Sequence, residues 1–106
     1  MGERACRDDA SVKVILREEA RSDALQAFEW YEERRAGLGI EFRDALDATI
    51  ARIVRYPLAY VSGERGLRRA LVSRFPYAVY FRVYPEAVVV VGVLHGKRHP
   101  RVVKAR

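Results

Sequence analysis

Side chains that could bind phosphate groups are concentrated in the C-terminal half of the sequence. The basic residues there are Arg65, Arg68, Arg69, Arg74, Arg82, His95, Lys97, Arg98, His99, Arg101, Lys104 and Arg106, and Tyr77, Tyr80 and Tyr84 lie between them. A surface of this composition can hold phosphates and stack on bases. In a metal-free ribonuclease, arginine or lysine would stabilise the charge on the scissile phosphate, while histidine or tyrosine would transfer protons.

His95 is the histidine that we expect at the end of a strand, where a rigid element would hold it. It is a candidate for proton transfer, and equally a histidine that only ends the strand. His95 and His99 have a spacing that suits a metal on a helix, but Gly96 and Pro100 argue against a helix there. We therefore predict no metal site. Gly37-Leu38-Gly39 lacks the third glycine of a phosphate-binding loop, and we predict no cofactor.

The charge is distributed unevenly along the chain. Residues 57–106 hold ten Lys or Arg and two Asp or Glu, a net charge of +8, whereas residues 18–56 have a net charge of −3. A cationic half attracts polyanions or an acidic protein through long-range, salt-sensitive steering. The alternative is that arginine only keeps a small sheet soluble.

The composition indicates one soluble domain. The chain has 106 residues, of which 50% are hydrophobic, enough for a single core. We place the domain at residues 12–106, after a flexible N-terminal extension of residues 1–11. Cys6 is the only cysteine, so no intrachain disulfide can form. The sequence has no apolar stretch near 18 residues and a polar N-terminus, and we predict a cytoplasmic protein that contacts no membrane.

Two adjacent segments predict the centre of a sheet. Residues 77–84 alternate with a period of two and are rich in aromatic and β-branched types, which is typical of a half-buried strand. Residues 87–95 are almost entirely apolar and valine-rich, as in an interior strand covered on both sides. A two-residue loop at Pro85-Glu86 would set four opposing pairs, namely Tyr84 with Ala87, Arg82 with Val89, Tyr80 with Val91, and Tyr77 with Leu94.

The alternation gives the hairpin two unlike faces. The apolar one carries Tyr77, Val79, Phe81 and Val83, and we expect helices to cover it. The other carries Tyr80, Arg82 and Tyr84, and we expect it to be open for binding. In the predicted register His95 lies opposite Pro76, roughly 20 Å from Arg82 at ~3.3 Å per residue. A compact site around His95 would therefore need other basic residues, namely Arg74, Arg98 or His99.

The remaining elements precede this hairpin. Residues 12–17 predict a short strand, residues 18–36 an amphipathic helix, and residues 40–56 a second helix that Pro57 ends. Gly37-Leu38-Gly39 would link the helices, and residues 67–73 predict another strand. The fold class is α+β in the order β-α-α-β-β-β, with an antiparallel helical hairpin on one face of a mainly antiparallel sheet.

Several of these residues also form a family pattern. It comprises Trp30-Tyr31-Glu32, Gly37-Leu38-Gly39, Phe42, Ile53 ahead of Pro57, Arg69, Arg74-Phe75-Pro76-Tyr77, His95, Arg98, Pro100 and Arg106. In this order the residues resemble the RelE/ParE-type toxins of bacterial type II toxin–antitoxin systems, and more closely the ParE-like branch of plasmid stabilisation proteins. Val103 departs from the pattern, because this branch more often has tryptophan there.

The resemblance implies a cognate antitoxin whose acidic and apolar segment wraps and neutralises the toxin. ParE-like members poison DNA gyrase without catalytic residues of their own. RelE-like members cut messenger RNA on the ribosome, commonly with help from a tyrosine in the C-terminal tail, and residues 96–106 contain no tyrosine. We therefore predict a gyrase-inhibiting toxin. The binding residues for antitoxin or target would be Arg69, Tyr80, Arg82, Tyr84, Lys97, Arg98 and Arg101.

Two alternatives remain open at this point. One is a ribosome-dependent messenger RNA endoribonuclease that uses Arg69, Arg74, His95 and Arg98. The other is a nucleic-acid-binding module without toxicity.

Overall fold

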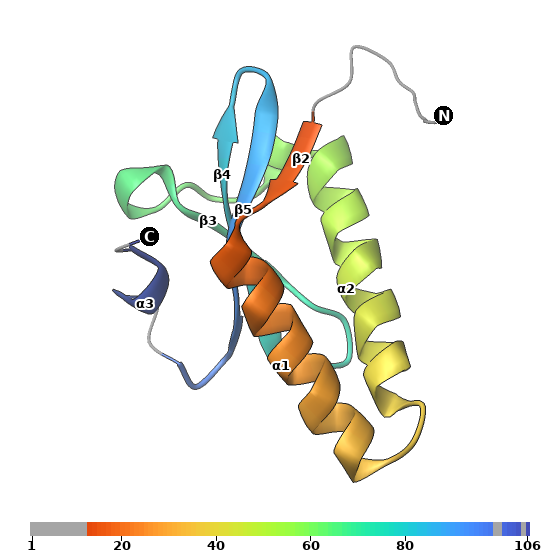
Figure 1. Cartoon of the computed structure of the whole chain (residues 1–106). Coiled ribbons are helices and arrows are strands. Elements are labelled where there is room, and N and C mark those ends of the chain that lie inside the picture. Colours follow the sequence, from red (N-terminus) through yellow and green to blue (C-terminus); the bar gives the residue numbers. More distant parts are fainter. Residues whose placement is uncertain (1–12, 99–100, 105) are drawn as a thin grey trace.

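The computed structural model describes residues 13–98, 101–104 and 106 (Figure 1). Along the chain lie β2 (Lys13–Leu16), α1 (Glu18–Arg34), α2 (Leu38–Arg55), two 3-10 turns (Pro57–Ala59 and Glu64–Gly66), β3 (Arg68–Leu71), β4 (Tyr77–Tyr84), β5 (Ala87–His95) and α3 (Arg101–Lys104). The predicted α+β class and β-α-α-β-β-β order are confirmed, and α3 is an additional helix. The predicted extension at residues 1–11 lies outside the described residues.

The strands form one sheet in the order β2-β5-β4-β3. β2 is parallel to β5, whereas β3 and β4, and β4 and β5, are antiparallel. β5 is therefore central, and seven of its nine residues are buried. This position explains its valine-rich sequence, because a strand covered on both faces has no solvent side to make polar.

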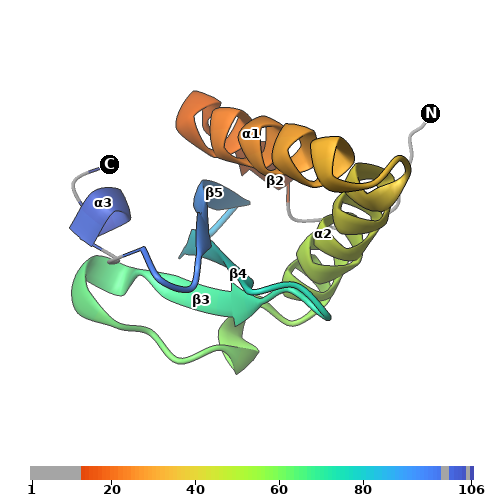
Figure 2. The same ribbon diagram turned by 90° about the horizontal axis from the view of Figure 1, so that it is seen from below.

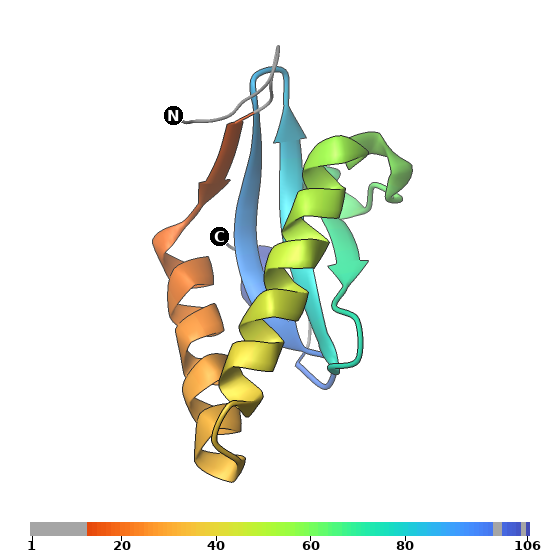
Figure 3. The same cartoon turned by 90° about the vertical axis from the view of Figure 1, so that its right-hand side faces the viewer.

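α1 and α2 lie on one side of the sheet and α3 lies on the other (Figures 2 and 3). The larger core is built between the helical hairpin and the sheet, from side chains of α1, α2, β3, β4 and β5. It includes an aromatic cluster of Tyr31, Phe42, Phe75 and Tyr77, with ring centroids 5.0–6.1 Å apart. The prediction that the helices cover the face with Val79 and Phe81 is confirmed.

The turn between α1 and α2 is held by Glu32. Its two carboxylate oxygens accept hydrogen bonds of 2.8 Å from the backbone N–H groups of Gly37 and Gly39. Gly37 has φ = +91°, which favours glycine. At Gly39 a Cβ atom would lie 2.6 Å from the backbone oxygen of Phe28, so the two helices approach too closely there for any other residue. These contacts explain why the link requires two glycines.

A β-bulge changes the predicted register of the β4–β5 hairpin. Tyr84 opposes Ala87 and Arg82 opposes Val89, as predicted. The register then shifts between Tyr80 and Phe81, which leaves Val91 without an opposing residue. Tyr80 therefore faces Gly92 and Tyr77 faces His95, so the predicted partners Val91 and Leu94, and Pro76 for His95, are wrong. The alternation could not locate the extra residue because the segment is apolar on both faces.

A second, smaller core fills the side of the sheet away from the helical hairpin. Val103 of α3 is fully buried there, and it packs in one cluster with Leu67, Ala78, Tyr80, Val91 and Leu94. Tyr80 is only 7% exposed. The prediction that this face is open is therefore wrong at Tyr80, because the C-terminal segment folds back over it.

Candidate functional site

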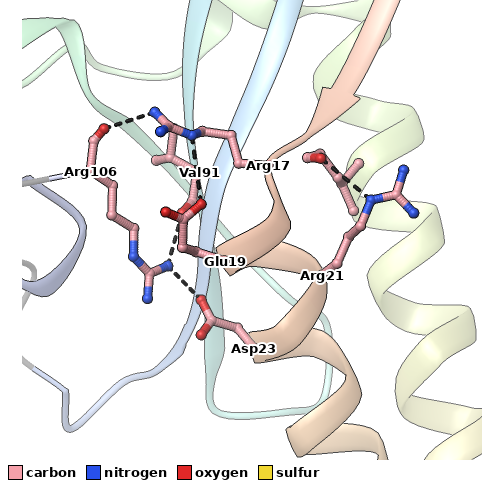
Figure 4. Close-up of polar contacts among 7 residues, drawn as sticks. Arg17, Glu19, Arg21, Asp23, Val91 and Arg106 are labelled. Carbon is pink, nitrogen blue, oxygen red and sulfur yellow. Dashed lines mark hydrogen bonds and ion pairs between the residues drawn. The ribbon is translucent and has the colours of Figure 1, made fainter.

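Asp23 and Arg106 bind the edge of β5 where β2 ends (Figure 4). β2 pairs with β5 only as far as Val90, so the backbone of β5 beyond this point needs other partners. The carboxylate of Asp23 accepts a hydrogen bond from the N–H of Val93 at 3.1 Å. Nη1 of Arg106 donates to the carbonyl oxygen of Val91 at 2.9 Å and to the Asp23 carboxylate at 2.8 Å. Two side chains that are 83 residues apart thus replace a missing strand.

Gly92 makes room for this arrangement. A Cβ atom on Gly92 would overlap Cγ1 of Val103 and lie 3.0 Å from Nη1 of Arg106. Arg17 adds a further contact, because its Nη1 donates to the backbone oxygen of Arg106 at 2.8 Å. We call the docked residues 101–104 and 106 the C-terminal strap. The strap packs on apolar side chains of the smaller core, and the ion pair between Arg106 and Asp23 holds its end.

The residues predicted to bind the antitoxin or the target lie at several places on the protein. Arg69 is exposed on β3 and opposes Tyr80, so its side chain is on the strap side of the sheet. Tyr84 is 47% exposed at the end of β4. Arg82 is half-buried, and its Nε donates to the carbonyl oxygen of Arg65 at 3.1 Å. Arg101 is exposed in α3. Their binding roles stay predictions.

A concavity of about 550 Å³ lies between α1 and the end of the hairpin. We call it the α1–β5 pocket; it is lined by Asp23, Gln26, Ala27, Trp30, Tyr31, Pro76, Tyr77, Val93, Leu94, His95 and Arg98. α1 positions Trp30 at its edge, where the indole is 49% exposed and the Arg34 guanidinium lies 4.0 Å from the ring centroid. The pocket therefore combines an exposed aromatic side chain with hydrogen-bond donors.

His95 and Arg98 are brought together at this pocket. The N–H of Lys97 donates to Nδ1 of His95 at 3.0 Å, which assigns the proton of a neutral ring to Nε2. The imidazole also packs edge-on against Tyr77, with centroids 5.3 Å apart. Lys97 and Arg98 follow in the exposed turn after β5.

The two tyrosines of the pocket are held in their neutral form. Burial raises the pKa of the Tyr31 hydroxyl above its usual value, and the neighbouring Tyr77 raises it further. Burial is also the main cause that raises the pKa of Tyr77, where Arg98 acts in the opposite direction and Asp23 adds to the rise. Both hydroxyls therefore act as hydrogen-bond donors near neutral pH.

The four residues of the ribonuclease alternative do not converge on one point. His95 and Arg98 line the α1–β5 pocket, on the side of the sheet that carries the helices. Arg69 lies on the opposite side with Tyr80. Arg74 is exposed in the turn before β4, at φ = +71°, and does not line the pocket. The predicted separation of His95 from Arg82 also holds, because Arg82 opposes Val89, six residues before His95.

Within the described ranges no three His, Cys, Asp or Glu side chains gather as a metal-binding group. None of the helices in the same part of the chain is long and apolar enough to cross a membrane.

Sequence reasoning missed the central role of Asp23 and assigned no function to Trp30 or Arg106. Asp23 lies on the exposed side of a helical pattern, where an acid has no distinctive signature. One usable signal was Gly92, since a glycine within a strand often marks a bulge or the close approach of another segment.

The arrangement of a helical hairpin on one face of a four-stranded sheet is shared with a solved toxin–antitoxin protein. The structure superposes on a chain from the "Chromosomal ParDE TA system from P. aeruginosa" with a TM-score of 0.72 and 12% sequence identity, covering 80% of this chain and 96% of that one. At this identity the similarity establishes the fold.

The family follows from the sequence. Residues 14–100 match the family model described as the ParE toxin of the type II toxin–antitoxin system parDE, and the chain belongs to this family. A sequence search against curated proteins finds no match.

Proposed function

We propose that the protein is the toxin of a type II toxin–antitoxin pair, that it inhibits DNA gyrase, and that a cognate antitoxin neutralises it. Membership of the ParE toxin family supports this proposal. The observation that favours gyrase over messenger RNA as the target is that the residues predicted for a ribonuclease site lie apart. Phosphodiester cleavage needs its charge-stabilising and proton-transferring groups around one phosphate. His95 and Arg98 share the α1–β5 pocket, but Arg69 lies on the opposite side of the sheet and Arg74 does not line the pocket. The four predicted residues therefore form no single cleavage site, which favours a protein-binding inhibitor over a ribonuclease.

The charge distribution supports a protein target and an acidic partner. The net charge of +8 over residues 57–106 includes the exposed side chains of Arg69, Arg98 and Arg101. Such a field accelerates the encounter with acidic surfaces and makes the association sensitive to salt.

The test is a supercoiling assay with purified protein and DNA gyrase. We expect loss of supercoiling or accumulation of cleaved DNA, and the addition of the cognate antitoxin should restore activity. The variant His95→Ala is the matched control, because a gyrase inhibitor should keep its activity without this imidazole whereas a histidine-dependent ribonuclease should lose it.

Two results would contradict the proposal. If gyrase is unaffected and messenger RNA is cut within translated codons, the ribonuclease alternative is correct. If induced expression without an antitoxin leaves growth unchanged, the protein is not a toxin and the nucleic-acid-binding alternative gains support.

A further inference from the structure

Two tyrosines of the α1–β5 pocket have hydroxyl groups that are available as donors. Tyr31 is 8% exposed and Tyr77 is half-buried, and neither hydroxyl forms a hydrogen bond within residues 13–98, 101–104 and 106. Both tyrosines line the pocket. An acceptor group that enters the pocket would satisfy them, so the site is suited to an oxygen-bearing ligand.

The pocket also selects for a negative charge. Arg98 and His95 line it, and Gln26 adds a side-chain amide. Asp23 is its only acid, and this carboxylate is already bound to Arg106 and to the N–H of Val93. The pocket thus offers donors and positive charge, and the one carboxylate among its lining residues is paired with Arg106 through Oδ2. A carboxylate or a phosphate fits these groups.

The geometry of the rings favours a peptide side chain over a nucleobase. A base binds best between or against flat aromatic faces. Trp30 and Tyr31 meet at 88°, and Tyr77 and His95 meet at 78°, so the rings form edge-to-face pairs. The guanidinium of Arg34 already covers one face of Trp30. The rest of the apolar wall comes from small aliphatic and proline side chains, which suit an irregular apolar side chain.

We propose that the α1–β5 pocket anchors an acidic segment of the antitoxin, with one apolar side chain against Trp30 and a neighbouring carboxylate bound by Tyr31, Tyr77 and Arg98. This inference rests on the proposed function, because it assigns the place where neutralisation begins. The apolar side chain would bury the exposed indole of Trp30, and the carboxylate would accept hydrogen bonds from the two tyrosine hydroxyls.

The sequence offers a direct probe of this pocket. Trp30 is the only tryptophan in the chain, so protein labelled with 5-fluorotryptophan gives a single ¹⁹F resonance that reports the pocket. The ligand added in the titration is the full antitoxin encoded beside the toxin gene. We expect the ¹⁹F resonance to shift on binding, and the shift to follow the same titration curve as the heat measured by calorimetry.

Affinity measurements on variants complete the test. Trp30→Ala and Arg98→Glu should each weaken antitoxin binding at least tenfold. Arg52→Glu, an exposed residue of α2, makes the same charge change away from the pocket and should stay within about threefold of wild type. Thermal unfolding of each variant checks that it folds. Because Arg98 is exposed, Arg98→Glu keeps the test valid if Trp30→Ala destabilises the protein.

The outcomes separate this inference from the proposed function. If the antitoxin binds wild type and both pocket variants equally, and the ¹⁹F resonance does not move, the pocket assignment is wrong while the proposed function stands. If the antitoxin does not bind the wild-type protein, the proposed neutralisation fails and this inference fails with it. If adenosine monophosphate shifts the resonance and the antitoxin does not, the pocket is a nucleotide site.

Discussion

Replacing Asp23 by alanine should loosen the C-terminal strap and destabilise the whole domain. The change removes two hydrogen bonds, one from the N–H of Val93 at 3.1 Å and one from Arg106 at 2.8 Å. It also leaves a backbone donor of β5 and a guanidinium without their partner. The side chains of Asp23 and Arg106 are 15% and 17% exposed, so water screens the pair only in part.

The expected magnitude follows from these two bonds. A hydrogen bond to a charged group contributes about 1.5–3 kcal/mol, and partial exposure reduces this value. We expect Asp23→Ala to lower the free energy of unfolding by about 2–4 kcal/mol. Asp23→Asn keeps an acceptor for Val93, so it should lose about half as much. In urea denaturation the larger loss lowers the midpoint by on the order of 1–2 M.

A double-mutant cycle with Arg106→Ala isolates the contact between the two side chains. We expect a coupling free energy of about 1–2 kcal/mol. Glu41→Gln is the control, since its exposed ion pair with Arg35 should contribute less than about 0.5 kcal/mol. Single variants within 0.5 kcal/mol of wild type, together with zero coupling, would refute the structural role assigned to Asp23.

Three further changes test other parts of the structure. Gly92→Ala should displace the strap, because its Cβ would overlap Val103, and trypsin should then cleave after Arg101 faster than in wild type; an unchanged cleavage rate would contradict this. Val103→Ala should lower the free energy of unfolding in urea by about 1–3 kcal/mol, since this side chain is fully buried, and a loss below 0.5 kcal/mol would mean that the strap does not pack. Glu32→Gln should lower the melting temperature at pH 7, because the N–H groups of Gly37 and Gly39, with Gly37 the larger cause, hold the pKa of Glu32 below its usual 4.5. This contribution is present above about pH 4.5 and is lost as the pH falls through the lower folded pKa, so the two proteins should converge in acid, and a constant difference in melting temperature across this range would argue against it.

The local patterns predicted the elements well. β4 and β5 occupy the segments 77–84 and 87–95 that alternation and valine content indicated. The helical hairpin with its glycine link follows from the same kind of signal, because helix periodicity and positive φ are properties of neighbouring residues. The strap was not predictable in this way. Residues 101–104 form a single turn, and contacts with distant segments hold it in place, among them the burial of Val103 against the sheet and the hydrogen bonds of Arg106.

The candidate site was predictable only in part. His95 and Arg98 were selected from the sequence, and they do share one pocket. Arg69 and Arg74 were grouped with them as basic residues of the family pattern, and neither property carries information about the side of the sheet. Tyr80 was placed correctly on the face away from the two helices. The exposure of Tyr80 depends on whether the C-terminal strap covers it, and the sequence of the hairpin carries no information about the position of the strap.

The sequence by itself determined the class of fold, the order of its elements and the sides of the hairpin, because each of these follows from periods of two to four residues. Only the tertiary structure decided the bulge at Val91, the ion pair between Asp23 and Arg106, and the pocket beside Trp30. The ion pair joins side chains that are 83 residues apart, and the pocket joins α1 to the end of the β4–β5 hairpin. Such contacts are selected by packing and by the need to satisfy the free edge of β5, and the period of a single segment does not contain them.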